Sequence, residues 1–102
     1  MEKDTYTTDV IFRVVKTKDF KGTVIALFPH DAYNHRGNVV TYQHVGQHSE
    51  GNYQHLVYTT KLATEIEYSD LKAELESTGY NLNIIKKQNY PKFLKNLKEI
   101  RK

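Results

Sequence analysis

Two copies of the tripeptide Tyr-Gln-His are the residues of this sequence best suited to binding chemistry. They stand at positions 42–44 and 53–55, and the turn-rich tetrapeptide Ser-Glu-Gly-Asn at 49–52 lies between them. If that tetrapeptide joins two antiparallel strands, side-chain alternation places one set of residues on a single face of the hairpin. This predicted surface, which we call the Tyr/His face, comprises Tyr42, His44, Gly46, His48, Tyr53 and His55.

Several kinds of chemistry would suit the Tyr/His face, and a merely solvated hairpin would account for it too. Tyrosine and histidine rings stack on nucleobases, and Arg36 or nearby lysines would then meet phosphates. His44 and His48 have a zinc-like spacing only on a helix, whereas His44 and His55 would be better placed but lack a third ligand. Acid–base catalysis by a histidine requires a nucleophile and an orienting partner, and the sequence identifies neither. We therefore predict a ligand-binding face without a metal, cofactor or catalytic residue, and favour a non-enzymatic protein.

The second candidate surface is the basic C-terminal end of the chain. Positions 86–102 carry seven basic residues and one acidic residue, a local charge of +6, whereas positions 1–85 carry −3. In this segment Phe93, Leu94, Leu97 and Ile100 recur at helical spacing and should pack on the sheet. The opposite side carries Lys92, Lys95, Lys98 and Lys102. These lysines either contact nucleic-acid phosphates or form an ordinary solvated helix face.

The elements that must position these residues follow from apolar periodicity. Strands are predicted at 9–16, 23–28, 39–45, 52–59 and 81–87, with Pro29 ending the second one. Thr64 and Glu67 form a capping box for a helix that ends at Gly79 in a Schellman stop, and Pro91 begins a last helix. The order β-β-β-β-α-β-α over residues 1–102, with 1–7 frayed, predicts one α+β domain. We expect an antiparallel sheet of about five strands, with both helices on one face.

Three strings of residues carry a resemblance to a known group of proteins. They are VIALFP at 24–29, YQHVGQH at 42–48, and DLKAELE at 70–76 running on to GYNL at 79–82. Over roughly residues 10–87 the chain resembles a family of short proteins of unknown activity encoded by bacteriophages and related mobile elements. The resemblance implies an accessory protein acting in a bacterial cytoplasm, and it brings no catalytic residues with it.

Composition narrows the remaining alternatives. The chain has no cysteine, which excludes disulfides, thiolate catalysis and Cys-ligated metals and favours a reducing compartment. Its first residues have no apolar signal segment, and no apolar run is long enough to span a membrane, so we expect a cytoplasmic protein. Our leading hypothesis is binding of nucleic acid or a nucleotide through the Tyr/His face and the basic helix. The alternative is an inhibitor or adaptor that binds a bacterial host protein, as a monomer or a homodimer.

Overall fold

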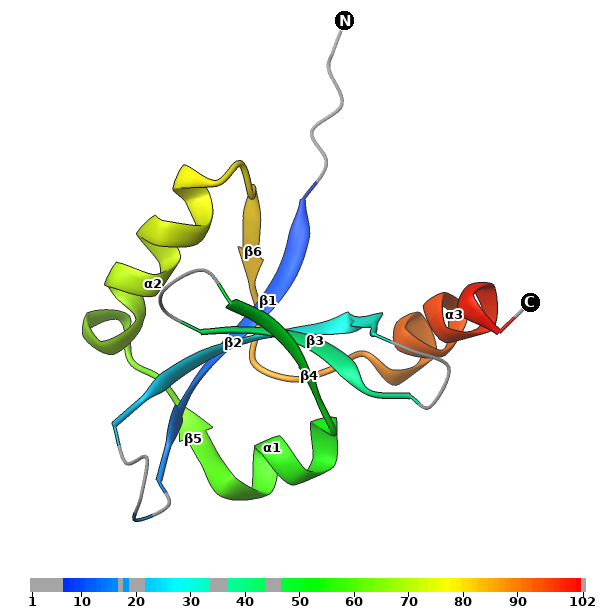
Figure 1. Cartoon of the computed structure of the whole chain (residues 1–102), viewed down its shortest axis with the longest axis horizontal. Coiled ribbons are helices and arrows are strands. Elements are labelled where there is room, and N and C mark those ends of the chain that lie inside the picture. Colours follow the sequence, from blue (N-terminus) through cyan, green and yellow to red (C-terminus); the bar gives the residue numbers. More distant parts are fainter. Residues whose placement is uncertain (1–6, 17, 19–21, 34–36, 44–46, 102) are drawn as a thin grey trace, which may run out of the picture.

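The computed structural model describes residues 7–16, 18, 22–33, 37–43 and 47–101 of the 102-residue chain. Four strands come first, and helices then alternate with short strands, as Figure 1 shows. In chain order they are β1 (Thr8–Val15), β2 (Val24–Ala32), β3 (Val39–Gln43), β4 (Gln47–Gly51), α1 (Tyr53–Thr59), β5 (Thr60–Leu62), α2 (Glu65–Ser77), β6 (Leu82–Ile84) and α3 (Tyr90–Ile100). The predicted α+β class is confirmed.

The sheet is built around β1. Its strand order is β4-β3-β2-β1-β5, and each neighbouring pair on this path is antiparallel. The edge of β1 that faces away from β2 pairs with two short strands. β5 pairs with its C-terminal half, from Arg13 to Val15, and β6 pairs in parallel with its N-terminal half, from Thr8 to Val10. β1 is therefore a central strand, and its apolar side chains enter the core on both faces, with Val10 and Phe12 in one cluster and Ile11 and Val15 in another.

The two faces of the sheet are covered by different helices, one on the first face and two on the second. On one face, Phe12 and Phe28 pack with Leu75 of α2, and the rings of Phe12 and Tyr68 stack 4.6 Å apart. On the other face, Leu56 of α1 packs against a cluster containing Ile11, Val15, Ile25 and Leu27. Next to it, Phe93 and Leu97 of α3 cover Ala32 and Val39.

The prediction that the helices share one face is therefore wrong. α2 lies on one face, α1 and α3 lie on the other, and α2 and α3 stand at opposite sides of the view in Figure 1. The physical reason is the continuous apolar sequence of β1 and β2. Apolar side chains on both faces of a strand must both be removed from water, so one helical layer is not enough.

The α2 helix has the ends that its sequence predicts. Thr64 is the N-cap, its hydroxyl accepts the backbone N–H of Glu67, and the Glu67 carboxylate accepts the N–H of Thr64 in return. At the other end Gly79 has a φ of +107°, and the N–H of Tyr80 donates to the carbonyl of Leu75. Both the capping box and the Schellman stop are confirmed.

The strand predicted at 52–59 is wrong, because this segment forms α1. Asn52 caps the helix by accepting the backbone N–H of His55, and Tyr53 and Leu56 then share the face that packs on the sheet. The partner of β3 is instead β4, with Tyr42 opposite His48. Aromatic and β-branched residues favour strands only weakly, and packing of a helical face overrides that preference here.

Pro29 does not end β2 as predicted. The strand continues to Ala32 through an irregularity between Phe28 and Ala32, where pairing with β3 shifts register. A bulge accommodates a proline, which has no N–H to contribute to the ladder. The backbone groups of this bulge find partners in the C-terminal segment. The Pro29 carbonyl accepts from Nε2 of Gln88 at 2.7 Å, and the Ala32 N–H donates to Oδ1 of Asn96 at 2.7 Å.

Candidate functional site

The predicted Tyr/His face does not form as one surface. Tyr42 is 3% exposed, lies in the core beneath α2, and donates its hydroxyl to Oε2 of Glu74 at 2.5 Å. Tyr53 packs on the opposite face of the sheet, and His55 is exposed on α1. The predicted placement of these residues on one face is wrong because 53–55 begin a helix.

The other residues of the predicted face are not brought together by any contact among the described residues. His44 and Arg36 lie outside the described residues. His48 is paired in β4, where its backbone stands opposite Tyr42. Any ligand-binding role of these residues stays a prediction.

The basic helix is docked as predicted, with one exception in its apolar stripe. Phe93 and Leu97 are each 5% exposed, so the stripe packs on the sheet, but Ile100 is 41% exposed and wrongly predicted as buried. Lys95 and Lys98 are exposed, as are Lys86 and Lys87 in the segment that leads to α3. Lys102 lies outside the described residues.

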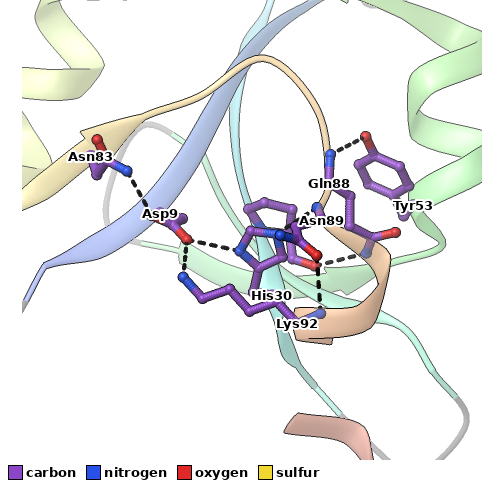
Figure 2. A network of polar contacts seen from close by, with 8 residues as sticks. Asp9, His30, Tyr53, Asn83, Gln88, Asn89 and Lys92 are labelled. Atoms are coloured by element: carbon purple, nitrogen blue, oxygen red, sulfur yellow. Dashed lines mark hydrogen bonds and ion pairs between the residues drawn. The ribbon is translucent and has the colours of Figure 1, made fainter. Parts of the chain in front are cut away.

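Lys92 differs from the other lysines because it is held by an acidic partner. Its Nζ lies 2.6 Å from Oδ2 of Asp9, and the same oxygen lies 2.9 Å from Nδ1 of His30 (Figure 2). Oδ1 of Asp9 accepts from the amide of Asn83 at 2.9 Å. This polar cluster joins β1, β2, β6 and α3, so Lys92 has a structural contact besides any role toward a ligand.

The two neighbours of His30 show which of its ring nitrogens carries the hydrogen. Its Nε2 lies 2.7 Å from the backbone N of Asn89, which can only donate, so Nε2 is the acceptor. Nδ1 therefore carries the hydrogen and donates a hydrogen bond to Asp9. An Asp–His pair of this kind resembles an acid–base dyad. In this cluster, however, the imidazole is 8% exposed and the nitrogen that would take a substrate proton is occupied by the backbone.

Electrostatics keep Asp9 ionised within this cluster. Burial raises the pKa of its carboxyl, but hydrogen bonds from Lys92, Asn83 and His30 and the charge of Lys92 outweigh burial and lower the pKa to about 2. Burial raises the pKa of the neighbouring Asp31, His30 opposes this rise in part, and the smaller effects of Asp9 and Lys92 have opposite signs. Both carboxylates border an open cleft of about 390 Å³ between β1, β2 and α3.

This cleft has a mixed charge, which limits what it can bind. Lys92 and Lys95 line it together with Asp9, Asp31 and Glu99. Carboxylates repel phosphates, so the cleft itself is a poor phosphate site, and a polyanion would instead meet the exposed side of α3. The described residues contain no group of three or more His, Cys, Asp or Glu side chains placed to hold a metal ion.

Sequence reasoning did not find the Asp9–His30–Lys92 cluster. Its members are separated by more than twenty positions each, and only the pairing of β1 with β2 and the docking of α3 bring them together. No local pattern signals such a cluster. The one available hint was His30 directly after Pro29, at the place where a strand must become irregular.

Comparisons with known proteins do not assign the chain to a family. No protein-family model matches the sequence, and neither the curated proteins nor the solved structures give a significant match. The resemblance to bacteriophage-encoded proteins therefore stays a prediction. Of the helices formed by described residues, none has the length and apolar character needed to cross a membrane.

Proposed function

We propose that this protein is a non-enzymatic accessory protein that binds nucleic acid through the exposed lysines of α3, in a bacterial cytoplasm. The observation that carries the proposal is the orientation of this helix. Phe93 and Leu97 are buried against the sheet, and Lys95 and Lys98 are exposed on the rest of the helix surface. Lys95 also lines the cleft that Asp9 and Asp31 border, whereas Lys98 does not. The lysines supply phosphate contacts, which give affinity without sequence specificity.

Rigid attachment of the helix supports this proposal. Asn89 caps α3 by accepting the N–H of Lys92, Asn96 binds the β2 backbone, and Gln88 binds both Pro29 and the hydroxyl of Tyr53. A helix fixed at both its start and its middle holds the backbone positions of its lysines in one arrangement. Little conformational entropy is then lost when a ligand binds.

The test is binding of fluorescently labelled 20-nucleotide single and double strands, measured by anisotropy at 50 mM salt. The double variant Lys95→Gln/Lys98→Gln should bind about ten-fold or more weakly, because each phosphate contact contributes through counterion release. The control variant Lys61→Gln/Lys72→Gln removes the same charge from exposed or half-exposed positions on β5 and α2. Equal weakening by both variants would mean that only the net charge matters and that α3 is not the site.

A second candidate function rests on a different surface. Leu62 and Ile84 are 42% and 38% exposed and line a groove of about 330 Å³ beside β5 and β6. Phe12 and Tyr68 also line it. Exposed apolar residues around a groove favour protein binding, as an adaptor or a homodimer would require. Sedimentation equilibrium tests the homodimer. A dimeric wild type that Leu62→Asp converts to the 11.9 kDa monomer would support it, and a monomeric wild type would remove it.

A further inference from the structure

A groove between α1 and α3 combines an exposed aromatic ring with amide side chains. It has a volume of about 290 Å³, near the lower end of the roughly 300–1,000 Å³ typical of small-molecule sites. Tyr90, Leu94 and Arg101 line it from α3, and Asn52 and Gln54 line it from the start of α1. Its size suits a single flat ring system better than an extended ligand.

Tyr90 is the residue best placed to stack on such a ring. It is 58% exposed, although it stands in the first turn of a docked helix. Its ring centroid lies 6.2 Å from that of the buried Phe93, with the planes inclined by 33°. This contact orients the tyrosine ring while leaving more than half of the residue accessible, which is what a stacking platform needs.

The amide groups supply what a nucleobase edge requires. Gln54 is exposed, and Asn52 is exposed and held in place because its Oδ1 caps α1. Gln88 is fixed because its backbone N–H donates to the Tyr53 hydroxyl and its side-chain Nε2 donates to the Pro29 carbonyl. An amide carries both a donor and an acceptor, so Gln54 can pair with the hydrogen-bonding edge of an unpaired base, while Asn52 and Gln88 each use one of their amide atoms within the protein.

The charge around the groove is complementary to a phosphate backbone. None of the described residues that line it is acidic, and Arg101 is among them. Lys98 does not line the groove, but it lies four positions after Leu94 and three before Arg101, so it is a neighbour of these two lining residues on the helix surface. The cleft on the other side of α3 differs sharply, because Asp9, Asp31 and Glu99 line it.

We infer that this groove receives an unpaired nucleobase stacked on Tyr90, so that the protein prefers single-stranded over double-stranded nucleic acid. The inference deepens the function proposed above and rests on it, because the lysines of α3 supply the phosphate contacts. A base inside a duplex is stacked and paired and cannot enter the groove. The groove therefore adds affinity only for a strand whose bases are free.

The experiment compares 12-nucleotide oligo-dT, oligo-U and a 12-base-pair duplex, each fluorescently labelled, by anisotropy. Tyr90→Ala should weaken binding of the single strands about ten-fold or more, the contribution of one stacked base, and leave duplex binding unchanged. Tyr90→Phe keeps the ring and should bind like the wild type. Tyr58→Ala is the matched control, because Tyr58 is 81% exposed on α1 and does not line the groove. The ratio between oligo-U and oligo-dT shows whether RNA or DNA is preferred.

A second variant guards against loss of fold. Gln54→Ala changes the opposite wall of the groove and should weaken single-strand binding roughly two- to ten-fold, the effect of one hydrogen bond. Thermal unfolding of each variant checks that the domain is intact.

The remaining outcomes contradict the inference in distinguishable ways. If Tyr90→Ala and Gln54→Ala bind single strands like the wild type while the lysine variant does not, the base site is wrong and the proposed function stands. If the wild type binds no oligonucleotide, both fail. If the wild type is a dimer that Tyr90→Ala dissociates, a second copy of the chain occupies the groove and the inference is overturned.

Discussion

Asp9 links more parts of the molecule than any other described side chain in the polar cluster. One carboxylate contacts His30 on β2, Lys92 on α3 and Asn83 on β6, while its own backbone belongs to β1. Such a half-buried carboxylate is stabilising only while it is ionised and all its partners are present. Its role is to hold the start of α3 against the sheet.

The pKa of Asp9 predicts a specific dependence of stability on pH. Because the pKa falls from 3.8 to about 2 on folding, the ionised carboxylate stabilises the folded state above about pH 4. That contribution, about 1–2 kcal/mol, is lost as the pH falls from about 4 to 2. Urea unfolding of the wild type and of Asp9→Asn should show this difference at pH 6 and little difference near pH 2.

The control for this measurement is Asp70→Asn, which removes an exposed carboxylate on α2. Its unfolding free energy should follow that of the wild type within about 0.5 kcal/mol at both pH values. An Asp9→Asn variant as stable as the wild type at pH 6 would show that the cluster does not stabilise the fold.

Among the elements, the capping box of α2 offers the cleanest test of local structure. Thr64→Ala removes the acceptor for the Glu67 N–H and should lower the free energy of unfolding by about 0.5–2 kcal/mol in urea denaturation. Ser69→Ala, at an exposed position within the same helix, should change it by less than about 0.5 kcal/mol. If both variants unfold like the wild type, Thr64 does not cap the helix in solution.

The docking of α3 predicts a larger effect. Leu97 is 5% exposed in the cluster with Phe93, so Leu97→Ala should cost about 2–5 kcal/mol of unfolding free energy. Ile66→Ala, at a position 90% exposed, is the matched control and should cost little. Truncation after Asn89 should also lower the thermal midpoint. A truncated chain that melts at the wild-type temperature would make α3 an appendage.

Sequence reasoning succeeded for elements whose signals are local. The Thr64 capping box, the Gly79 stop and the apolar stripe of α3 are each formed within one helix, and each was predicted. It failed for α1, whose aromatic and β-branched residues are equally compatible with a strand. The signal that was available was Asn52 as an N-cap, with Tyr53 and Leu56 three residues apart.

The candidate site was less predictable than the fold, for the same reason. The error at α1 changed the partner of β3, and with it the predicted Tyr/His face was lost. The lysines of α3 depend only on the phase of one helix, so Lys95 and Lys98 were placed correctly. Tertiary packing decides which side chains of other elements lie beside these lysines, and local sequence patterns carry no information about that packing.

At the scale of the whole molecule, one sheet separates two different surfaces. On one side α2 covers the core formed by β1, β2 and β3, and its exposed positions include Glu65, Glu67, Asp70 and Glu76. On the other side α3 carries Lys95 and Lys98. The small net charge of +3 thus conceals an acidic helix and a basic helix on opposite faces. A polyanion should approach from the α3 side only.

The salt dependence of nucleic-acid binding is the sharpest test of whether the lysines of α3 contact phosphates. For a 20-nucleotide single strand, the logarithm of the association constant should fall linearly with the logarithm of salt concentration between 50 and 200 mM. Lys95→Gln/Lys98→Gln should make this slope shallower by about 1.4, since each lost phosphate contact removes about 0.7. Lys61→Gln/Lys72→Gln should have the same slope as the wild type. A wild type without measurable binding at 50 mM salt, or a slope that the α3 variant does not change, would contradict such contacts.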